Sequence, residues 1–191
     1  MSTPCDKKLP RLKLCSNCSD SAQDGAGECS CCVAPMEQFL LAFKSIIADA
    51  PTAQKQFDIS TDTQNQVTAI SIEDVSNSIL TAERQNNNTL VVPVCQIVGI
   101  QSGLAGQVSL TPPSSIESGF CSCCEAPLRK RLIDIKTAGT SINVATLGSG
   151  NFTNIENVTV TDVGEGMAIF YKNATTKYAL SICKIAYIEI L

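Results

Sequence analysis

Histidine and tryptophan are absent from this chain of 191 residues, and only 17% of its residues are charged. Without histidine, the chain lacks the side chain that most often serves as a general base and as a metal ligand near neutral pH. The sequence also contains no Ser/His/Asp set, no paired-carboxylate constellation and no glycine-rich phosphate loop. We therefore expect no catalytic residues, no enzymatic activity and no cofactor.

Positive charge is also in short supply. The chain has 14 Lys+Arg against 18 Asp+Glu, which gives a net charge of −4 and argues against a nucleic-acid partner. No apolar run approaches the ~18 residues of a membrane span, and Met1–Leu14 has no apolar core of a secretory signal. We expect synthesis in the cytoplasm, with no membrane partner.

Cysteine, by contrast, is abundant, with 11 in the chain. In a reducing compartment such a density is typical of metal binding or redox chemistry rather than of structural disulfides. An odd number also leaves at least one thiol unpaired within a single chain, which favours links between chains.

The most informative pattern is a repeat. The phrase Cys-Ser-Cys-Cys-x-Ala-Pro occurs at Cys29–Pro35 and again at Cys121–Pro127, 92 positions later (29 to 121). A closing phrase, Val94–Ile100, is matched by Ile182–Ile188 at a spacing of 88 (95 to 183), so the first copy carries four extra residues. The chain is therefore a duplicated module with duplicated cysteines.

Each copy is predicted to be a helix followed by strands. After Pro35, one helical stripe is apolar (Met36, Phe39, Leu40, Phe43, Ile46 and Ile47), and the second copy has Leu128, Leu132 and Ile135 on one face. The second helix also carries Arg129, Lys130 and Arg131, which we expect on a solvated face. Alternating apolar residues and turn signals follow each helix. We predict a flexible arm (1–28), a first module (29–100), a linker (101–120) and a second module (121–191).

The closing phrases carry a resemblance. Val92–Ile100 and Leu180–Ile188 resemble the last two strands of Sm-like domains, which read apolar-Pro-apolar-x-x-Ile-x-x-Ile. Asp74 and Asp162, each followed by valine, stand where that family places an aspartate. The resemblance implies a mostly β fold with two tandem, small, strongly bent Sm-like or SH3-like β-barrels, each preceded by a short α-helix. In that family, open strand edges pair between subunits to make rings.

The chain departs from the family at the RNA-binding positions. The family's Arg-Gly is missing, since Leu90–Val92 and Ala179–Ser181 stand there. Asn77 is the only remnant of the base-contacting pair, and Glu165 occupies the matching position in the second copy. The resemblance therefore implies the shape without the RNA binding, and an Sm-like RNA-binding protein stays an alternative.

The repeated cysteine phrase and the composition also resemble small cysteine-rich proteins of endospore-forming bacteria, found in spore coats, exosporia and spore appendages. That resemblance implies synthesis in the mother cell and oxidation when that cell lyses. It implies a final location at the spore surface, in the exosporium or in an extracellular appendage, with other spore-surface proteins as further partners.

The cysteines are predicted to fall into two groups. Cys95 and Cys183 lie inside apolar runs, where we expect buried thiols. Adjacent cysteines rarely reach the Cα separation that a disulfide needs, so clustered cysteines favour links to different partners. The candidates for intermolecular disulfides are Cys5, Cys15, Cys18, Cys29, Cys31, Cys32, Cys121, Cys123 and Cys124.

Two readings of the clusters stay open. Cys15 and Cys18, with Cys29, Cys31 and Cys32, supply enough thiolates for a tetrahedral zinc site, although Cys-x-Cys-Cys crowds its ligands. The favoured hypothesis is a structural protein that self-assembles, pairs strand edges with copies of itself and is locked by disulfides into a ring, layer or fibre.

Overall fold

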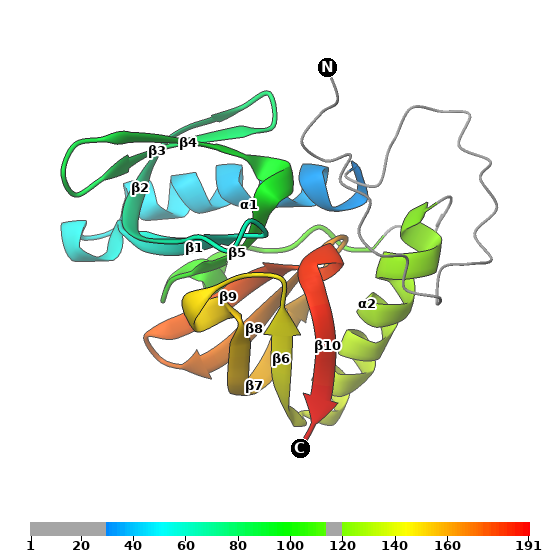
Figure 1. Cartoon of the computed structure of the whole chain (residues 1–191). Helices are drawn as coiled ribbons and strands as arrows, with labels where there is room; N and C mark the ends of the chain where they lie inside the picture. Colours follow the sequence, from blue (N-terminus) through cyan, green and yellow to red (C-terminus); the bar gives the residue numbers. More distant parts are fainter. Residues whose placement is uncertain (1–29, 114–119) are drawn as a thin grey trace.

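The computed structural model describes residues 30–113 and 120–191 (Figure 1). The predicted arm, residues 1–28, lies outside the described residues, and so do Cys5, Cys15, Cys18 and Cys29. For Cys31, Cys121, Cys123 and Cys124 the structure describes the backbone only.

The first half of the chain is one helix followed by five antiparallel strands. Its elements are α1 (Ser30–Ala48), β1 (Phe57–Thr61), β2 (Gln66–Ser76), β3 (Ile79–Arg84), β4 (Thr89–Pro93) and β5 (Ile97–Gln101). Three short 3-10 turns connect them: η3 (Thr52–Gln54), η4 (Val94–Gln96) and η5 (Ala105–Gln107). The predicted apolar stripe of α1 is confirmed as its buried face, since Met36, Leu40 and Phe43 are fully buried.

The second half repeats this order. Its elements are α2 (Phe120–Ala138), β6 (Ser141–Thr146), β7 (Asn154–Val163), β8 (Met167–Asn173), β9 (Thr176–Ser181) and β10 (Ile185–Ile190), with 3-10 turns η6 (Gly150–Phe152) and η7 (Ile182–Lys184). The predicted mostly β class is therefore confirmed. Below, residues 30–101 are called the first module and residues 120–191 the second module.

The helices begin earlier than the position of their prolines suggests. The sequence predicts Pro35 as a first helical residue, yet α1 begins at Ser30 and α2 at Phe120, so both prolines lie inside helices. Pro35 is the sixth residue of α1 and Pro127 the eighth of α2, so each removes a helical hydrogen bond beyond the first four N–H groups, which have no partner within the helix. The helices thus begin well before their prolines. As a result, Cys31 and Cys32 belong to α1, and Cys121, Cys123 and Cys124 belong to α2.

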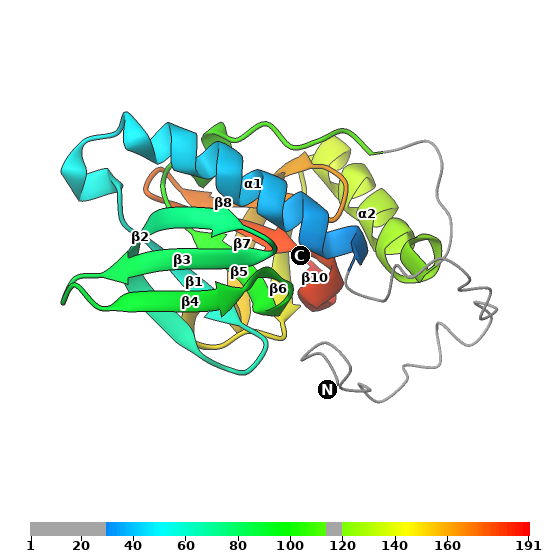
Figure 2. The same cartoon turned by 90° about the horizontal axis from the view of Figure 1, so that it is seen from above.

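All ten strands form one sheet, in the order β10-β6-β7-β8-β9-β5-β1-β2-β3-β4. Two small, strongly bent barrels in tandem were expected, and these are not confirmed, because the strands form one continuous sheet that does not close. The modules join where β5 of the first pairs antiparallel with β9 of the second. Figure 2 shows the helices against the sheet, with α1 above the first module and α2 beside the second. The sheet ends at β4 and β10.

The repeat holds at the level of single contacts. In the first module, Lys44 lies 3.7 Å from Asp74, and in the second Lys136 lies 2.9 Å from Asp162. A β-bulge interrupts β2 between Ile72 and Asp74, and an equivalent bulge interrupts β7 between Val160 and Asp162. Bulges bend strands, so repeated bulges give the two modules the same curvature.

The hydrophobic core crosses the module boundary. A cluster built on α1 and β1–β5 also contains Met167, Ile169 and Ala179, which belong to β8 and β9. A second cluster, around Leu132, Phe152 and Phe170, fills the second module. Since apolar burial is the main favourable term in folding, the modules stabilise each other and are not independent units.

Candidate functional site: the module junction and the free sheet edges

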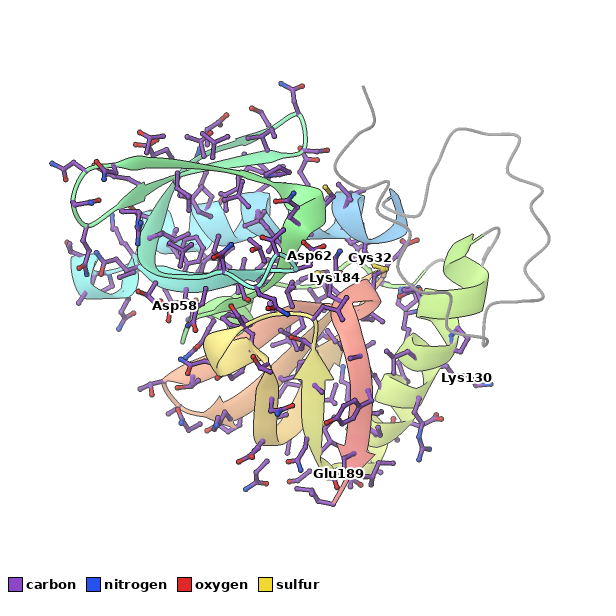
Figure 3. The ribbon with its side chains drawn as sticks, viewed as in Figure 1. Cys32, Asp58, Asp62, Lys130, Lys184 and Glu189 are labelled. Atoms are coloured by element: carbon purple, nitrogen blue, oxygen red, sulfur yellow. A yellow bond between two sulfur atoms is a disulfide. The ribbon has the colours of Figure 1, made fainter. Side chains whose placement is uncertain are left out.

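A disulfide joins the two modules. Cys32, in the first turn of α1, is bonded to Cys183 in η7, with the Cα atoms 6.2 Å apart and a sequence separation of 151. Cys32 is 7% exposed. Figure 3 shows Cys32 near Lys184 and Asp62, at the seam between the modules. Because the bond closes most of the chain into one loop, it restricts the unfolded chain strongly.

This bond corrects two predictions. Cys32 was expected to reach another chain and Cys183 to be a buried thiol, but they bind each other within the chain. Cys95 is half-buried rather than buried. The physical reason is the same for Cys95 and Cys183. Each lies in a 3-10 turn just before the last strand of its module, and a residue of an apolar run that falls in such a turn does not have to be buried.

The strand pairing at the junction is close-packed. Gly99 is opposite Leu180, Ile100 is opposite Ala179, and Gln101 is opposite Tyr178. A Cβ placed on Gly99 would lie 2.5 Å from Leu180 Cδ2 and 2.7 Å from the Ala179 carbonyl oxygen. Only glycine leaves room for that approach. Burial raises the pKa of the Tyr178 phenol, and the nearby Asp58 carboxylate acts in the same direction.

Polar contacts complete the junction. Lys184 Nζ lies 2.6 Å from Asp62 Oδ2, and both side chains are mostly shielded from solvent. The backbone N–H of Ser149 donates to Ser60 Oγ at 2.8 Å, and that of Asn151 donates to Gln66 Oε1 at 3.0 Å. These contacts could not be predicted from the sequence, because each joins residues 85 or more positions apart.

Gly99→Val tests how tightly this junction is packed. We expect the free energy of unfolding to fall by about 1–3 kcal/mol, because the new side chain meets backbone as well as Leu180. Gln101→Ala, on the same strand, is the control and is expected to change it by less than about 0.5 kcal/mol. Guanidinium denaturation followed by circular dichroism measures both variants. Equal midpoints for the two variants would contradict the close packing.

A buried ion pair fixes α2 to the second module. Arg129 Nη1 lies 3.1 Å from Glu125 Oε2, and the two side chains are 5% and 3% exposed. Glu125 Oε1 also accepts a hydrogen bond of 3.0 Å from the backbone N–H of Gly166 in the β7–β8 turn. Arg129 was expected on a solvated face with Lys130 and Arg131. Only the latter two are exposed, so the prediction for Arg129 is wrong.

The two free edges carry exposed apolar side chains. Val91 on β4 is 61% exposed, and on β10 Tyr187 is 61% and Ile190 is 46% exposed. With Leu191, these are four of the seven large exposed hydrophobic residues in the part of the chain that the structure describes. Unpaired strand edges with apolar side chains are templates for pairing with another chain, because their N–H and C=O groups have no strand partner.

A groove of about 370 Å³ lies beside the free edge of β4. Its lining includes Leu90, Val91, Val92, Pro93 and Gln96. The equivalent residues of the second module are 178–181 and 184, by the matching strand registers of the two modules. Those equivalents contact the first module at the junction, through β5 and Asp62. The groove of the first module therefore corresponds to the surface of the second module that the first module covers at the junction.

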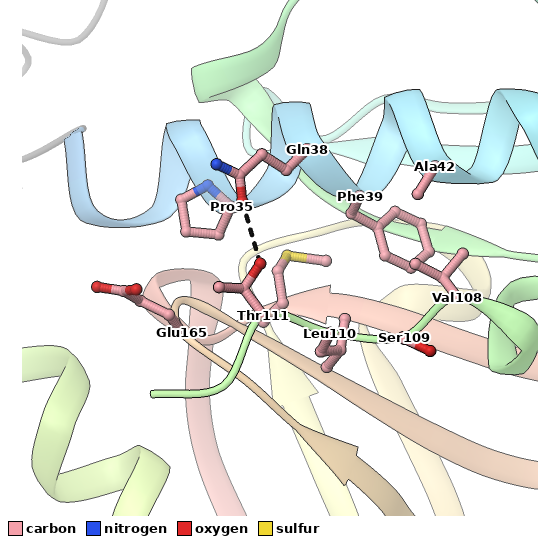
Figure 4. Close-up of a pocket in the computed structure, with 10 residues that line it drawn as sticks. Pro35, Gln38, Phe39, Ala42, Val108, Ser109, Leu110, Thr111 and Glu165 are labelled. Carbon is pink, nitrogen blue, oxygen red and sulfur yellow. Dashed lines mark hydrogen bonds between the residues drawn. The ribbon is translucent and has the colours of Figure 1, made fainter. Parts of the chain in front are cut away.

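A smaller pocket of about 170 Å³ lies between α1 and the segment that leaves the first module (Figure 4). Gln38 Oε1 accepts a hydrogen bond of 3.1 Å from Thr111 Oγ1 across it. Among the described residues that line it, Glu165 is the only ionisable one. A single carboxylate with apolar and amide neighbours matches no nucleophile–base arrangement.

The predicted zinc ligands fall mostly outside the described side chains. Of the five, Cys32 alone has a described side chain, and it is bonded to Cys183. Among the residues that the structure describes, no group of three or more cysteine, aspartate or glutamate residues is placed to hold a metal ion. Within the same residues, neither helix is long and apolar enough to cross a membrane.

No protein-family model, curated protein or solved structure matches this chain.

Proposed function

We propose that this chain is a structural protein that assembles with copies of itself through its two free sheet edges and is cross-linked by disulfides. The observation that carries the proposal is the internal junction, in which β5, the last strand of the first module, pairs with β9, the fourth strand of the second module. The two ends of the sheet leave one open edge of each kind, since β4 is the fourth strand of its module and β10 the last strand of its module. An edge of each kind on one molecule is the requirement for head-to-tail assembly.

The proposal extends to shape and place. A helix followed by five antiparallel strands in each half supports the resemblance to Sm-like modules, whose open edges pair between subunits. Head-to-tail contacts give a ring if the rotation closes and a filament if it does not. The cysteine phrase supports the spore surface or a spore appendage as the location, where oxidation after release from the mother cell would set the disulfides.

Val91→Pro tests the edge. The bonds from Val94 N–H to the Ser78 carbonyl and from Arg84 N–H to the Asn88 carbonyl bracket β4. Backbone groups alternate between the two sides of a strand, so the N–H of Val91 points to the open edge. We expect Val91→Pro to raise the protein concentration needed for assembly by about tenfold or more, because it removes a donor and adds a ring at the contact.

Val91→Thr is the matched control, because it keeps the N–H and the branched shape, and it should assemble like the natural chain. Light scattering and negative-stain electron microscopy of the full chain, with and without reductant, measure the effect. A natural chain that stays monomeric at every concentration under oxidising conditions would contradict the proposed function.

A further inference from the structure

We propose that successive copies repeat the internal junction, with β10 of one copy paired to β4 of the next and a disulfide between Cys124 of the first copy and Cys95 of the next. The inference rests on the proposed self-assembly and adds its strand register and its covalent link. The occupant of the β4 groove is thus the last strand of a second copy of this chain.

The cysteines of the internal link recur in the sequence at matching places. Cys32 stands three residues before Pro35 in α1, and Cys124 stands three residues before Pro127 in α2. Cys183 is the middle residue of η7, and Cys95 is the middle residue of η4.

In the internal bond, Cys32 comes from the helix of the module whose last strand, β5, lies at the junction. Cys183 comes from the 3-10 turn of the module whose fourth strand, β9, lies there. The proposed contact between β10 of one copy and β4 of the next is called the outer contact. There the equivalent cysteines are Cys124 of the first copy and Cys95 of the next. The same relation between modules that brings Cys32 to Cys183 therefore brings these two together.

The strand register follows from the same equivalence. Ile100 pairs with Ala179 at the internal junction, and their equivalents are Ile188 on β10 and Val91 on β4. The hydrogen bond from Leu191 N–H to the Ser141 carbonyl fixes the alternation along β10, so the backbone N–H of Ile188 points to the open edge. Ile188 and Val91 of the next copy thus form a hydrogen-bonded pair.

The outer contact is similar to the internal one and not identical. Tyr187 stands where Gly99 stands, so the strands cannot approach as closely there as Gly99 and Leu180 do. The ion pair of Lys184 with Asp62 has no counterpart, since the equivalent residues are Gln96 and Leu147. The non-covalent part of the outer contact is therefore weaker, and the disulfide is what makes it permanent.

The link forms by thiol–disulfide exchange with a small oxidised disulfide such as oxidised glutathione. The Cys124 thiolate attacks one sulfur, forms a mixed disulfide and releases one glutathione thiolate. The Cys95 thiolate of the next copy then attacks the Cys124 sulfur and releases the second glutathione thiolate. Two cysteines are oxidised by two electrons, and one glutathione disulfide is reduced to two thiols.

The test uses the full chain with the other seven cysteines (Cys5, Cys15, Cys18, Cys29, Cys31, Cys121 and Cys123) changed to serine. Oxidation with glutathione disulfide should give a ladder of covalent oligomers on a non-reducing gel, which reductant collapses to monomer. Adding Cys95→Ser or Cys124→Ser should each leave monomers only. Mixing those two variants should restore covalent dimers and nothing larger, since each dimer then lacks the cysteines to extend.

Peptide mapping of mixed ¹⁴N and ¹⁵N chains identifies the bond, which should join Cys95 and Cys124 of different chains. A bond between these cysteines within one chain, or a ladder that survives Cys124→Ser, would overturn the inference. If the natural chain assembles but its map lacks this bond, the inference fails and the proposed function stands. If the natural chain does not assemble at all, both fail.

Discussion

Changing both Cys32 and Cys183 to serine is expected to lower the free energy of unfolding by about 3–5 kcal/mol. The reason is the length of chain that the bond closes, 151 positions, which places the expected effect near the upper end for a single disulfide. The bond also holds the first turn of α1 against η7 of the other module. Its loss therefore weakens the contact between the modules in the folded state and also raises the conformational entropy of the unfolded chain.

Assembly would add to the measured stability, so the comparison belongs in the Val91→Pro background, where the edge contact is weakened. Guanidinium unfolding without reductant gives the difference, and adding reductant should bring the parent to the level of the double variant. Cys95→Ser, a cysteine change in the matching turn of the first module, is the control and should shift the midpoint far less. A parent that is insensitive to reductant would contradict a stabilising role for the bond.

Local features of the modules could be predicted because they depend on neighbours in sequence. The apolar residues from Met36 to Ile47 recur with the helical period, which predicted one buried helix face, and the structure buries that face. The four extra residues of the first copy are real, but they are a difference of two changes. In the first copy the segment between the helix and β1 is longer by seven residues (92 to 85), and the loop between β1 and β2 is shorter by three (85 to 88) than the matching loop between β6 and β7.

The junction was only partly accessible from the sequence. The sheet joins the modules through one edge and leaves two outer edges, an arrangement that the open strand edges of the Sm-like resemblance allow. Which strands would meet was not predictable, because alternation says which side chains are buried and not which strand lies next to which. Gly99 could have signalled the close approach, since glycine inside an apolar strand marks a place where another backbone comes near.

The cysteines show the same limit. Cys183 lies in an apolar run, and such a run does not distinguish a strand from a turn that exposes one of its residues. The repeat itself held part of the missing information, since it places a helix cysteine and a turn cysteine at matched positions in each copy. The structure shows that Cys32 and Cys183 form one such bond within the chain, and the bond between Cys124 and Cys95 belongs to the proposed contact between copies.

Glu125→Gln is expected to lower the free energy of unfolding by about 3 kcal/mol or more. The change removes the negative charge beside the Arg129 guanidinium, which is 5% exposed and cannot recover its full hydration. An amide oxygen can still accept the hydrogen bond from the Gly166 N–H, so the loss reports mainly on the charge pair. Urea or guanidinium unfolding of the full chain measures it.

Glu156→Gln is the matched control, because Glu156 is exposed on β7 of the same module and should change stability by less than about 0.5 kcal/mol. A second variant separates the charge effect from the packing effect. Arg129→Met added to Glu125→Gln removes the buried guanidinium as well, so the double variant should be more stable than Glu125→Gln alone. If Glu125→Gln costs no more than the control, the pair does not hold α2 against the β7–β8 turn.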